Sequence, residues 1–495
     1  MVDADTATKL IQNCTPNLAD SAFMAWAAAQ VFVMIPALAM FEGGLVRSKN
    51  VLSLFAQIFV GLAVLSVMFF LVGFSLIFGD DKGGFIGGLD YVALKGFDPS
   101  TCFGRVATLP STLYALYECM FAVITPLLIT GAFAERLTFR AYVVFIVVWE
   151  LTVYYPVAHW IWGGGWLMQR GALDFAGGIV VHTTAGAAAL VTAVMLGARA
   201  GHGVSHALKP HSVPLTMIGG GLLWFGWFGF NGGSAYRSGG DAASATLNTH
   251  IAASACGVVW LLISWKREGR PHTVDVMNGI IAGLAGITPV AGYCSPVAAL
   301  VIGIVLGLLA DGAVILLTDV LHIDDALEVS AVHGATGLIG SLATGFVASS
   351  TYSDAVTNEG LFIHGGSGKL LGEQVLAVVV TLAWSGVWSW IIFAFIERVL
   401  GWDLRVSAAE EDEGLDVGQH EGHAYLFSRL AIYEEVFPEE ETPPPSIFTT
   451  ARSRSQMRRD HYHGPTSIYT SVDTPLFSSV NGSLRDASRT RSMHV

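Results

Sequence analysis

Charged residues are scarce in this sequence: Asp, Glu, Lys and Arg together make up only 13% of its 495 residues. Soluble domains carry about 25% charged residues, so a chain with so few does not expose most of its surface to water. Hydrophobic residues reach 53%, and long runs of them recur along the chain. The composition therefore excludes a soluble enzyme and predicts an integral membrane protein.

Two kinds of short motif are also lacking. The five cysteines form no Cys-x-x-Cys pair, which argues against a zinc ribbon or a redox motif. The N-terminal stretch has neither the basic segment nor the cleavage site of a secretory leader. The first apolar run, from about Phe23 to Leu45, is therefore predicted to be a retained helix that directs insertion.

The long apolar segments predict the fold class. A hydrocarbon core of about 30 Å needs about 20 apolar residues in each helical span. The sequence predicts an all-α integral membrane protein with about eleven transmembrane helices, which begin near residues 22, 51, 112, 140, 178, 213, 242, 277, 295, 328 and 373. Basic residues such as Arg47, Arg136, Arg199 and Arg267 fall in alternate connections, which the positive-inside rule places in the cytoplasm. An odd number of spans then puts the N-terminus outside and the C-terminus in the cytosol.

Composition divides the chain into four parts. We predict an extracellular N-terminal segment (1–21), a transmembrane domain (22–400), a cytoplasmic C-terminal region (401–441) and a disordered cytoplasmic tail (442–495). The tail is rich in Pro, Ser, Thr and Arg and shows no periodicity. Its hydroxyl residues alternate with arginines, which fits a phosphorylation switch served by a kinase or signalling protein, or else a solvated tail with some affinity for anionic lipid.

The predicted outer side carries two cysteines and a glycosylation sequon. Cys14 and Cys102 would lie in an oxidising compartment, and Asn13-Cys14-Thr15 is an acceptor sequence for a sugar. A bridge between protomers, a bridge from Cys14 to Cys102, a sugar on Asn13 and an unmodified end all remain open from the sequence.

The two halves of the chain contain a repeated spacing pattern. Asp174 stands eight residues before His182, with Gly186 four residues further on; Asp325, His333 and Gly337 repeat this spacing. With five spans between corresponding elements, an odd number, the halves would have opposite topology. The pattern predicts a five-plus-five inverted repeat, with a substrate path near the midplane between the halves.

The two histidines of this repeat are the strongest local indication of function. Ionisable side chains inside membrane helices are costly and usually line a pathway. A neutral imidazole offers one donor and one acceptor, which suits a small polar substrate. A metal site is the competing hypothesis, but zinc needs three or four ligands and no third His or Cys falls at a suitable place on these spans. We therefore predict that His182 and His333 line a pore, and that the chain holds no metal and no cofactor.

Polar and aromatic residues flank the histidines. Asp174 could cap the helix that follows it, support a cation, or do both. Trp162 precedes a run of glycines, and the segment from Trp224 to Ser234 alternates aromatics with glycines. Such aromatics form either an interfacial belt or a cage that attracts cations by its π faces.

Several of these stretches resemble the ammonium transporter (Amt/Mep/Rh) family, on its Amt side. Asp174–Gly186 is similar to the family signature almost residue for residue, and the resemblance extends from about Phe23 to Tyr425. It includes Gly43–Asn50, Gly131–Arg136, Gly226–Asn231, Ile287–Pro289 and Val332–Gly334.

The resemblance implies a homotrimer in the plasma membrane that conducts ammonium or methylammonium through one pore in each protomer. Ammonium ion would be recruited outside, deprotonated, and conducted as NH3, with or without the proton. The implied roles are recruitment for Trp162, Trp227, Ser234, Tyr117, Thr288 and Asp174, a gate for Phe121 and Phe230, and the pore for His182 and His333. A regulatory role is implied for region 401–441, and a sensor that signals through its tail is the alternative function.

Three residues depart from the family pattern. Tyr117 stands where Phe is common, Glu118 where an amide is common, and Glu42 where an uncharged residue is more usual. Glu118 could raise the local affinity for cations or carry a proton, and the sequence alone assigns it no role in conduction.

Overall fold

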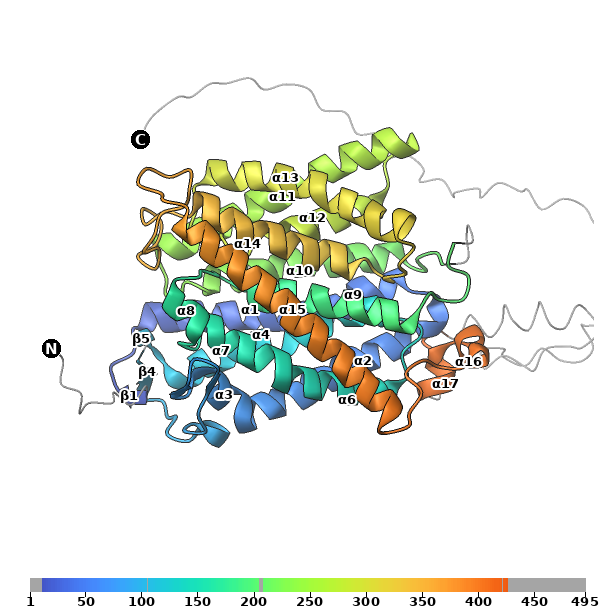
Figure 1. Ribbon diagram of the computed structural model, residues 1–495, viewed down its shortest axis with the longest axis horizontal. Helices are drawn as coiled ribbons and strands as arrows, with labels where there is room; N and C mark the ends of the chain where they lie inside the picture. The colour runs from blue at the N-terminus through green and yellow to red at the C-terminus, as the bar shows by residue number, and fades with distance from the viewer. Residues whose placement is uncertain (1–10, 105, 204–207, 421, 426–495) are drawn as a thin grey trace, which may run out of the picture. The chain divides into compact units, whose positions relative to one another are not determined.

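A computed structural model describes residues 11–425 of the chain, apart from 105, 204–207 and 421 (Figure 1). The predicted tail, residues 1–10 of the predicted N-terminal segment and residues 426–441 of region 401–441 lie outside the described residues. In the described part the chain is mostly helical, as predicted. Its α-helices are α1 (Leu18–Leu45), α2 (Val51–Met68), α3 (Phe74–Phe78), α4 (Ser111–Leu128), α5 (Thr130–Phe133), α6 (Phe139–Trp149), α7 (Tyr155–Ile161), α8 (Trp166–Arg170), α9 (Thr184–Leu196), α10 (Val213–Gly233), α11 (Gly240–Glu268), α12 (Thr273–Ile287), α13 (Pro296–Ile315), α14 (Thr336–Val347), α15 (Lys369–Arg398), α16 (Ala408–Glu413) and α17 (Leu415–His420).

Several of these helices continue through π-helical turns, and short strands lie in the connections. The π-helical segments are η2 (Phe69–Gly73), η4 (Glu150–Tyr154), η5 (Gly178–Thr183), η6 (Leu316–Val320) and η7 (Ser330–Ala335), and the 3₁₀ turns are η1 (Ser48–Asn50) and η3 (Val92–Leu94). The strands are β1 (Ile11–Asn13), β2 (Asp81–Lys82), β3 (Ile86–Gly87), β4 (Thr101–Phe103) and β5 (Val106–Pro110). A π-turn inserts one extra residue into a helix and is frequent at functional sites.

Each of the eleven predicted spans coincides with a helical segment. In the described part of the chain, nine of these segments are long and apolar enough to cross a membrane. The segment α12 is shorter, at 15 residues, and the segment formed by η7 and α14 is not among the nine. The number of crossings, and the orientation of the chain, therefore stay predictions.

A small sheet and a disulfide close one end of the helices. Strand β4 pairs antiparallel with β1 and with β5, and Cys14 and Cys102 are disulfide-bonded with their Cα atoms 5.7 Å apart. Of the alternatives that the sequence left open, the structure has the bridge within one chain. We call this end the disulfide side; Figure 1 shows the strands there and α16 and α17 at the opposite end.

The opposite end, which we call the arginine side, is held by an ionic network around Arg47, Arg136 and Arg199. Glu135 accepts from Arg47 Nε at 3.0 Å and from Arg199 Nη1 at 3.1 Å. Burial alone would raise the pKa of Glu135, but Arg199 and Arg47 outweigh it and lower the pKa below its usual value. Asp324 behaves alike: burial opposes ionisation, yet the hydrogen bonds and charge of Arg199 lower its pKa to about 2. These carboxylates are therefore ionised and paired.

The two helical segments that carry the repeated spacing, η5 with α9 and η7 with α14, cross closely and in opposite directions. A Cβ atom on Gly186 would lie 2.1 Å from Gly334 Cα, so the backbones touch where only glycine fits. The backbone N–H of Arg199, just beyond the end of α9, donates to Asp324, just before η7, at 2.7 Å. The end of one repeat element thus lies beside the start of the other, as an inverted repeat requires.

Candidate functional site

The two histidines meet at the crossing of these helices. His182 lies on η5 and His333 on η7, and their Nδ1 atoms are 3.2 Å apart. The rings are nearly parallel, with centroids 5.2 Å apart, and they are 0% and 7% exposed. One Nδ1 must donate and the other accept, so the two rings are not both protonated at this contact. His182 Nε2 has no hydrogen-bond partner among the described residues, which leaves it open to a polar guest.

Two phenylalanines pack against each other, with their rings tilted by 36°, on the disulfide side of the histidines. The ring centroids of Phe121, on α4, and Phe230, on α10, are 4.3 Å apart. Trp162 meets Phe121 edge to face at 6.1 Å, and Tyr117 lies 5.0 Å from Phe121. The structure therefore brings the two predicted gate residues together and places two of the predicted recruitment residues beside them.

The hydroxyl groups of Tyr117 and Ser234, beside these two phenylalanines, donate hydrogen bonds to backbone carbonyls. Tyr117 Oη donates to Phe230 O at 2.8 Å or Gly229 O at 2.9 Å, and Ser234 Oγ donates to Phe230 O at 2.9 Å. The two hydroxyls lie 3.3 Å apart. The lone pairs of Ser234 Oγ are thereby free to accept a hydrogen bond from a cation.

Trp227 and Thr288, two further predicted recruitment residues, are bonded to each other beside His182. The Trp227 ring stacks at 5.5 Å on His182, and its Nε1 donates to Thr288 Oγ1 at 3.0 Å. The Thr288 hydroxyl in turn donates to Leu284 O at 2.8 Å. Trp227 thus lies between His182 and Phe230, with Thr288 bonded to it, whereas Trp162 contacts Phe121.

Asp174 caps the N-terminus of η5. Its two carboxylate oxygens accept the backbone N–H groups of Gly177, Gly178, Ile179 and Val180 at 2.7 to 3.0 Å, and the residue is 4% exposed. Its backbone carbonyl accepts Trp162 Nε1 at 2.9 Å, which orients that ring. The capping role that the sequence offered is observed; support of a cation stays a prediction.

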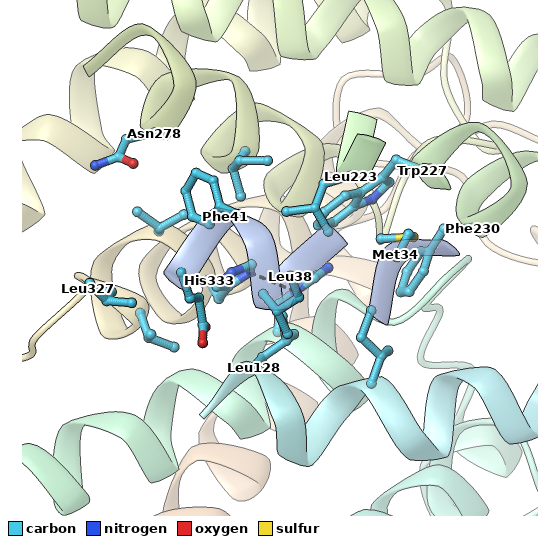
Figure 2. A pocket seen from close by; sticks show the side chains of 16 residues that line it. Met34, Leu38, Phe41, Leu128, Leu223, Trp227, Phe230, Asn278, Leu327 and His333 are labelled. Carbon is cyan, nitrogen blue, oxygen red and sulfur yellow. Dashed lines mark hydrogen bonds between the residues drawn. The ribbon is translucent and has the colours of Figure 1, made fainter. Parts of the chain in front are cut away.

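A narrow cavity is lined by both histidines together with Trp227 and Phe230 (Figure 2). Figure 2 shows Phe230 and Trp227 toward one end, His333 near the middle, and Asn278 and Leu327 toward the other end. Its walls are mostly aliphatic and aromatic, and the lining residues are Met34, Leu38, Phe41, Glu42, Ile124, Leu128, His182, Leu223, Trp227, Phe230, Asn278, Ile281, Leu327, Val329, Val332 and His333. The predicted pore histidines therefore face a mainly apolar space.

Sequence reasoning missed Tyr236. Its hydroxyl donates to Glu118 Oε1 at 2.6 Å, and its ring lies 5.9 Å from that of Tyr117. Tyr236 adopts a left-handed backbone conformation, with φ of 55°, in the turn that follows α10. The only sequence signal was its place two residues after Ser234 in a glycine-rich turn. The unexpected acid Glu118 thus has a phenolic partner beside the outer aromatics.

Comparison with known proteins decides the family. The sequence profile described as the Ammonium Transporter Family matches residues 22–425. The chain belongs to this family. Its members are transporters and channels rather than enzymes, which confirms both the resemblance and the exclusion of an enzyme.

Individual relatives agree with this assignment. The chain is 46% identical to "Ammonium transporter 1" of Dictyostelium discoideum, over 83% of this chain and 88% of that protein. It is 41% identical to the "Ammonium transporter" of Bacillus subtilis, over 83% and 99%. Among solved structures, Saccharomyces cerevisiae Mep2 superposes with a TM-score of 0.73 at 36% identity, over 80% of this chain and 89% of that one.

Proposed function

We propose that this member of the ammonium transporter family recruits ammonium ion on the disulfide side, deprotonates it there, and conducts NH3 through the cavity past His182 and His333. The observation that carries the proposal is the stacked histidine pair inside an apolar cavity behind two phenylalanines that pack against each other. Trp227, predicted as a recruitment residue, is assigned to the pore lining, and Thr288, predicted likewise, is assigned the role of holding the Trp227 ring.

The chemistry of the cavity favours this substrate. Moving an unpaired ion into an apolar space costs far more than moving a neutral hydrogen-bonding molecule. Ammonium can lose a proton and cross as NH3, whereas potassium has no neutral form. The free Nε2 of His182 then supplies a hydrogen-bond partner where water is excluded. Selection against potassium thus follows from the loss of the proton.

The outer groups suit a cation. The faces of Trp162, Tyr117 and Phe121 attract a small cation by their π electrons, and Ser234 Oγ has lone pairs free to accept from it. Asp174 uses its carboxylate on the backbone and holds Trp162 through its carbonyl. Its negative charge near the recruitment site favours a cation there, with no direct contact required.

We further propose the setting that the family suggests. The chain is a homotrimer of independent pores in the plasma membrane, with the disulfide side outside and region 401–441 on the cytoplasmic side. Leu415 N donates to Asn50 Oδ1 at 2.9 Å, and Ser53 N donates to Asp416 Oδ1 at 2.8 Å. These bonds support a regulatory role for that region. A sensor function is not favoured, because the curated relatives described above are transporters.

Uptake of labelled methylammonium tests the proposal. The chain would be expressed in cells that lack their own ammonium transporters, with unlabelled ammonium and potassium as competitors. We expect saturable uptake that ammonium blocks and potassium does not, and loss of most uptake when His182 and His333 are both replaced by alanine. Absence of uptake by the full chain and by a chain truncated after Tyr425, with both at the cell surface, would contradict the proposal.

A further inference from the structure

A short loop on the disulfide side lies against the turn that carries Trp162. The connection between α3 and α4 holds the antiparallel pair β2 and β3 as well as β4, so residues 81–87, which we call the β2–β3 loop, lie on the disulfide side. Gly84, between these two strands, accepts the N–H of Trp166 on its carbonyl at 3.0 Å. The β2–β3 loop is therefore attached to the chain just after Trp162.

A buried histidine joins the same loop to the chain just before Trp162. His159 lies on α7, three residues before Trp162, and is 0% exposed. Its Nδ1 is 2.6 Å from Ile77 O, and its Nε2 is 2.8 Å from Asp81 Oδ1. The Asp81 carboxylate also accepts the N–H of Gly84 at 2.8 Å, within the β2–β3 loop. Both ring nitrogens of His159 are therefore used, one toward a carbonyl and one toward a carboxylate.

These two contacts together require an additional proton. A carbonyl oxygen only accepts, so His159 Nδ1 must carry a hydrogen and donate it to Ile77 O. A neutral imidazole has one hydrogen, so its Nε2 would then present a lone pair to a carboxylate, which also only accepts. Two acceptors repel each other at 2.8 Å. The contact therefore holds only when one more proton lies between His159 Nε2 and Asp81 Oδ1.

The surroundings leave Asp81 as the ionisable partner of His159. The Asp81 side chain is 34% exposed and that of His159 is 0% exposed, so the pair exchanges its proton with solution through the aspartate. Helix α7 packs against α3, α8, β3, η4 and η5. In the described part of the chain, no titratable group of these elements, and none of those beside Asp81, is hydrogen-bonded to His159. These groups are Arg170, Glu150, Tyr154, His182, Asp80, Lys82 and Asp90.

The turn that carries Trp162 is built directly on His159. The carbonyl of His159 accepts the N–H of Gly163 at 3.0 Å. A Cβ atom on Gly163 would lie 2.5 Å from His159 Nδ1 and 2.0 Å from Ile77 O, so the turn approaches the imidazole where only glycine fits. The ring of Trp162, the residue before this glycine, contacts Phe121. A change in the position of His159 is therefore passed to a predicted recruitment residue.

We propose that His159 and Asp81 are positioning residues for ammonium recruitment, which hold the turn of Trp162 in place through one shared proton taken from the outer solution. The inference rests on the proposed function and adds the control of its recruitment site by external pH. While the pair keeps its proton, the β2–β3 loop stays attached and Trp162 keeps its contact with Phe121. When rising pH removes the proton, Asp81 turns from the buried lone pair toward water. Recruitment of the cation then weakens, although the substrate itself is unchanged.

Uptake kinetics at different external pH test this contact. Cells that express the full chain would be assayed for methylammonium uptake across a range of external pH in which methylammonium stays protonated. The informative variant is Asp81→Asn, because an amide N–H donates to the Nε2 lone pair of a neutral imidazole and needs no additional proton. Asp81→Ala removes the contact at every pH. Asp80→Asn is the matched control, because it removes the neighbouring carboxylate, which is exposed and not bonded to His159.

The expected result is a pH dependence of the uptake KM that one amide abolishes. In the wild type the KM rises by roughly threefold to tenfold from acidic to alkaline solution, which corresponds to the loss of one hydrogen bond. In Asp81→Asn this rise is absent, and in Asp81→Ala the KM is already high in acidic solution. The maximal rate changes less in each case, because neither residue of the pair lines the cavity. Asp80→Asn follows the wild type at every pH.

The outcomes separate this inference from the proposed function. A wild type that does not transport overturns the proposed function. A transporting wild type whose KM does not rise in alkaline solution overturns the inference alone. An equal rise in the wild type and in Asp81→Asn also overturns it, because another group then titrates. If Asp81→Ala does not reach the cell surface, Asp81→Asn decides by the same criteria. Failure of Asp81→Asn itself to fold would contradict the inference, since asparagine can satisfy both His159 and Gly84.

Discussion

The two aspartates of the internal repeat occupy matching positions but have different surroundings. The two carboxylate oxygens of Asp174 accept hydrogen bonds from four backbone N–H groups. Asp325 accepts one short hydrogen bond, from Ser330 N at 2.6 Å, with Val329 N and the Ser330 hydroxyl as weaker neighbours, and its Oδ1 has no partner of good geometry among the described residues. The same sequence spacing therefore yields a fully engaged cap at one end of the pore and an open acceptor at the other. The Asp174 carboxylate stabilises the start of η5, whereas the Asp325 carboxylate can still accept a hydrogen bond.

The largest expected effect comes from removing the two caps in turn. Asp174→Ala leaves four buried N–H groups without partners, each at a cost of about 1–3 kcal/mol, and it frees the loop that holds Trp162. We expect methylammonium uptake to fall by about a hundredfold or more and the unfolding temperature in detergent to drop. Asp325→Ala removes one such bond and should cost less in both measurements. Equal losses would refute the contrast between the ends.

The next largest effect is expected between the two ends, at the histidines. Replacing His182 by leucine removes the pore's unpaired imidazole nitrogen and its contact with His333. Uptake should fall by about tenfold, the value of one hydrogen bond to a polar guest, with little change in protein stability. Initial uptake rates, normalised to the protein at the cell surface, check this. An unchanged rate would show that the pore does not need the imidazole.

A smaller effect is expected at the outer aromatics. Trp162→Leu removes a π face that is worth about 1–2 kcal/mol to a partly desolvated cation, so the uptake KM should rise roughly tenfold while the efflux KM changes less. Trp26→Leu is the control, because that side chain is 58% exposed on α1. A rise in KM for the control as well would mean that the assay reports loss of apolar surface rather than cation binding.

The smallest effect is expected at Glu118. Glu118→Gln keeps the shape of the side chain and removes a titratable group from beside Tyr117, so the pH dependence of uptake should change while the fold stays intact. Tyr236→Phe removes only the 2.6 Å hydrogen bond and tests whether that partner matters. Uptake measured over a range of external pH decides. A profile identical to that of the wild type would exclude Glu118 from proton handling.

Much of the fold follows from local properties of the sequence. Each apolar run coincides with a helical segment because the hydrophobicity of about 20 consecutive residues is a local property, and it determines whether the segment inserts into a membrane. The histidine pair was also predictable, because a repeat of spacing places two ionisable residues at equivalent depths. The pairing of Cys14 with Cys102 was left open, since it depends on β1 lying against β4.

The finer arrangement of the site was not predictable from the sequence. Trp162 and Trp227 were assigned together, yet Trp162, at the end of α7, contacts Phe121, whereas Trp227, on α10, contacts Phe230 and His182. The Glu118–Tyr236 contact joins residues 118 positions apart, and nothing local to either residue indicates it.

The sequence by itself determined the membrane class, the helices, the family signature and the histidine pair, because these depend on composition and on spacing along one chain. The tertiary structure alone decided which acids are engaged and which are open. Asp174 meets four backbone donors, whereas Asp325 and Glu328 meet an open pocket. The physical reason is that hydrogen-bond satisfaction depends on what crosses nearby, and here that is set by helices that touch at Gly186 and Gly334.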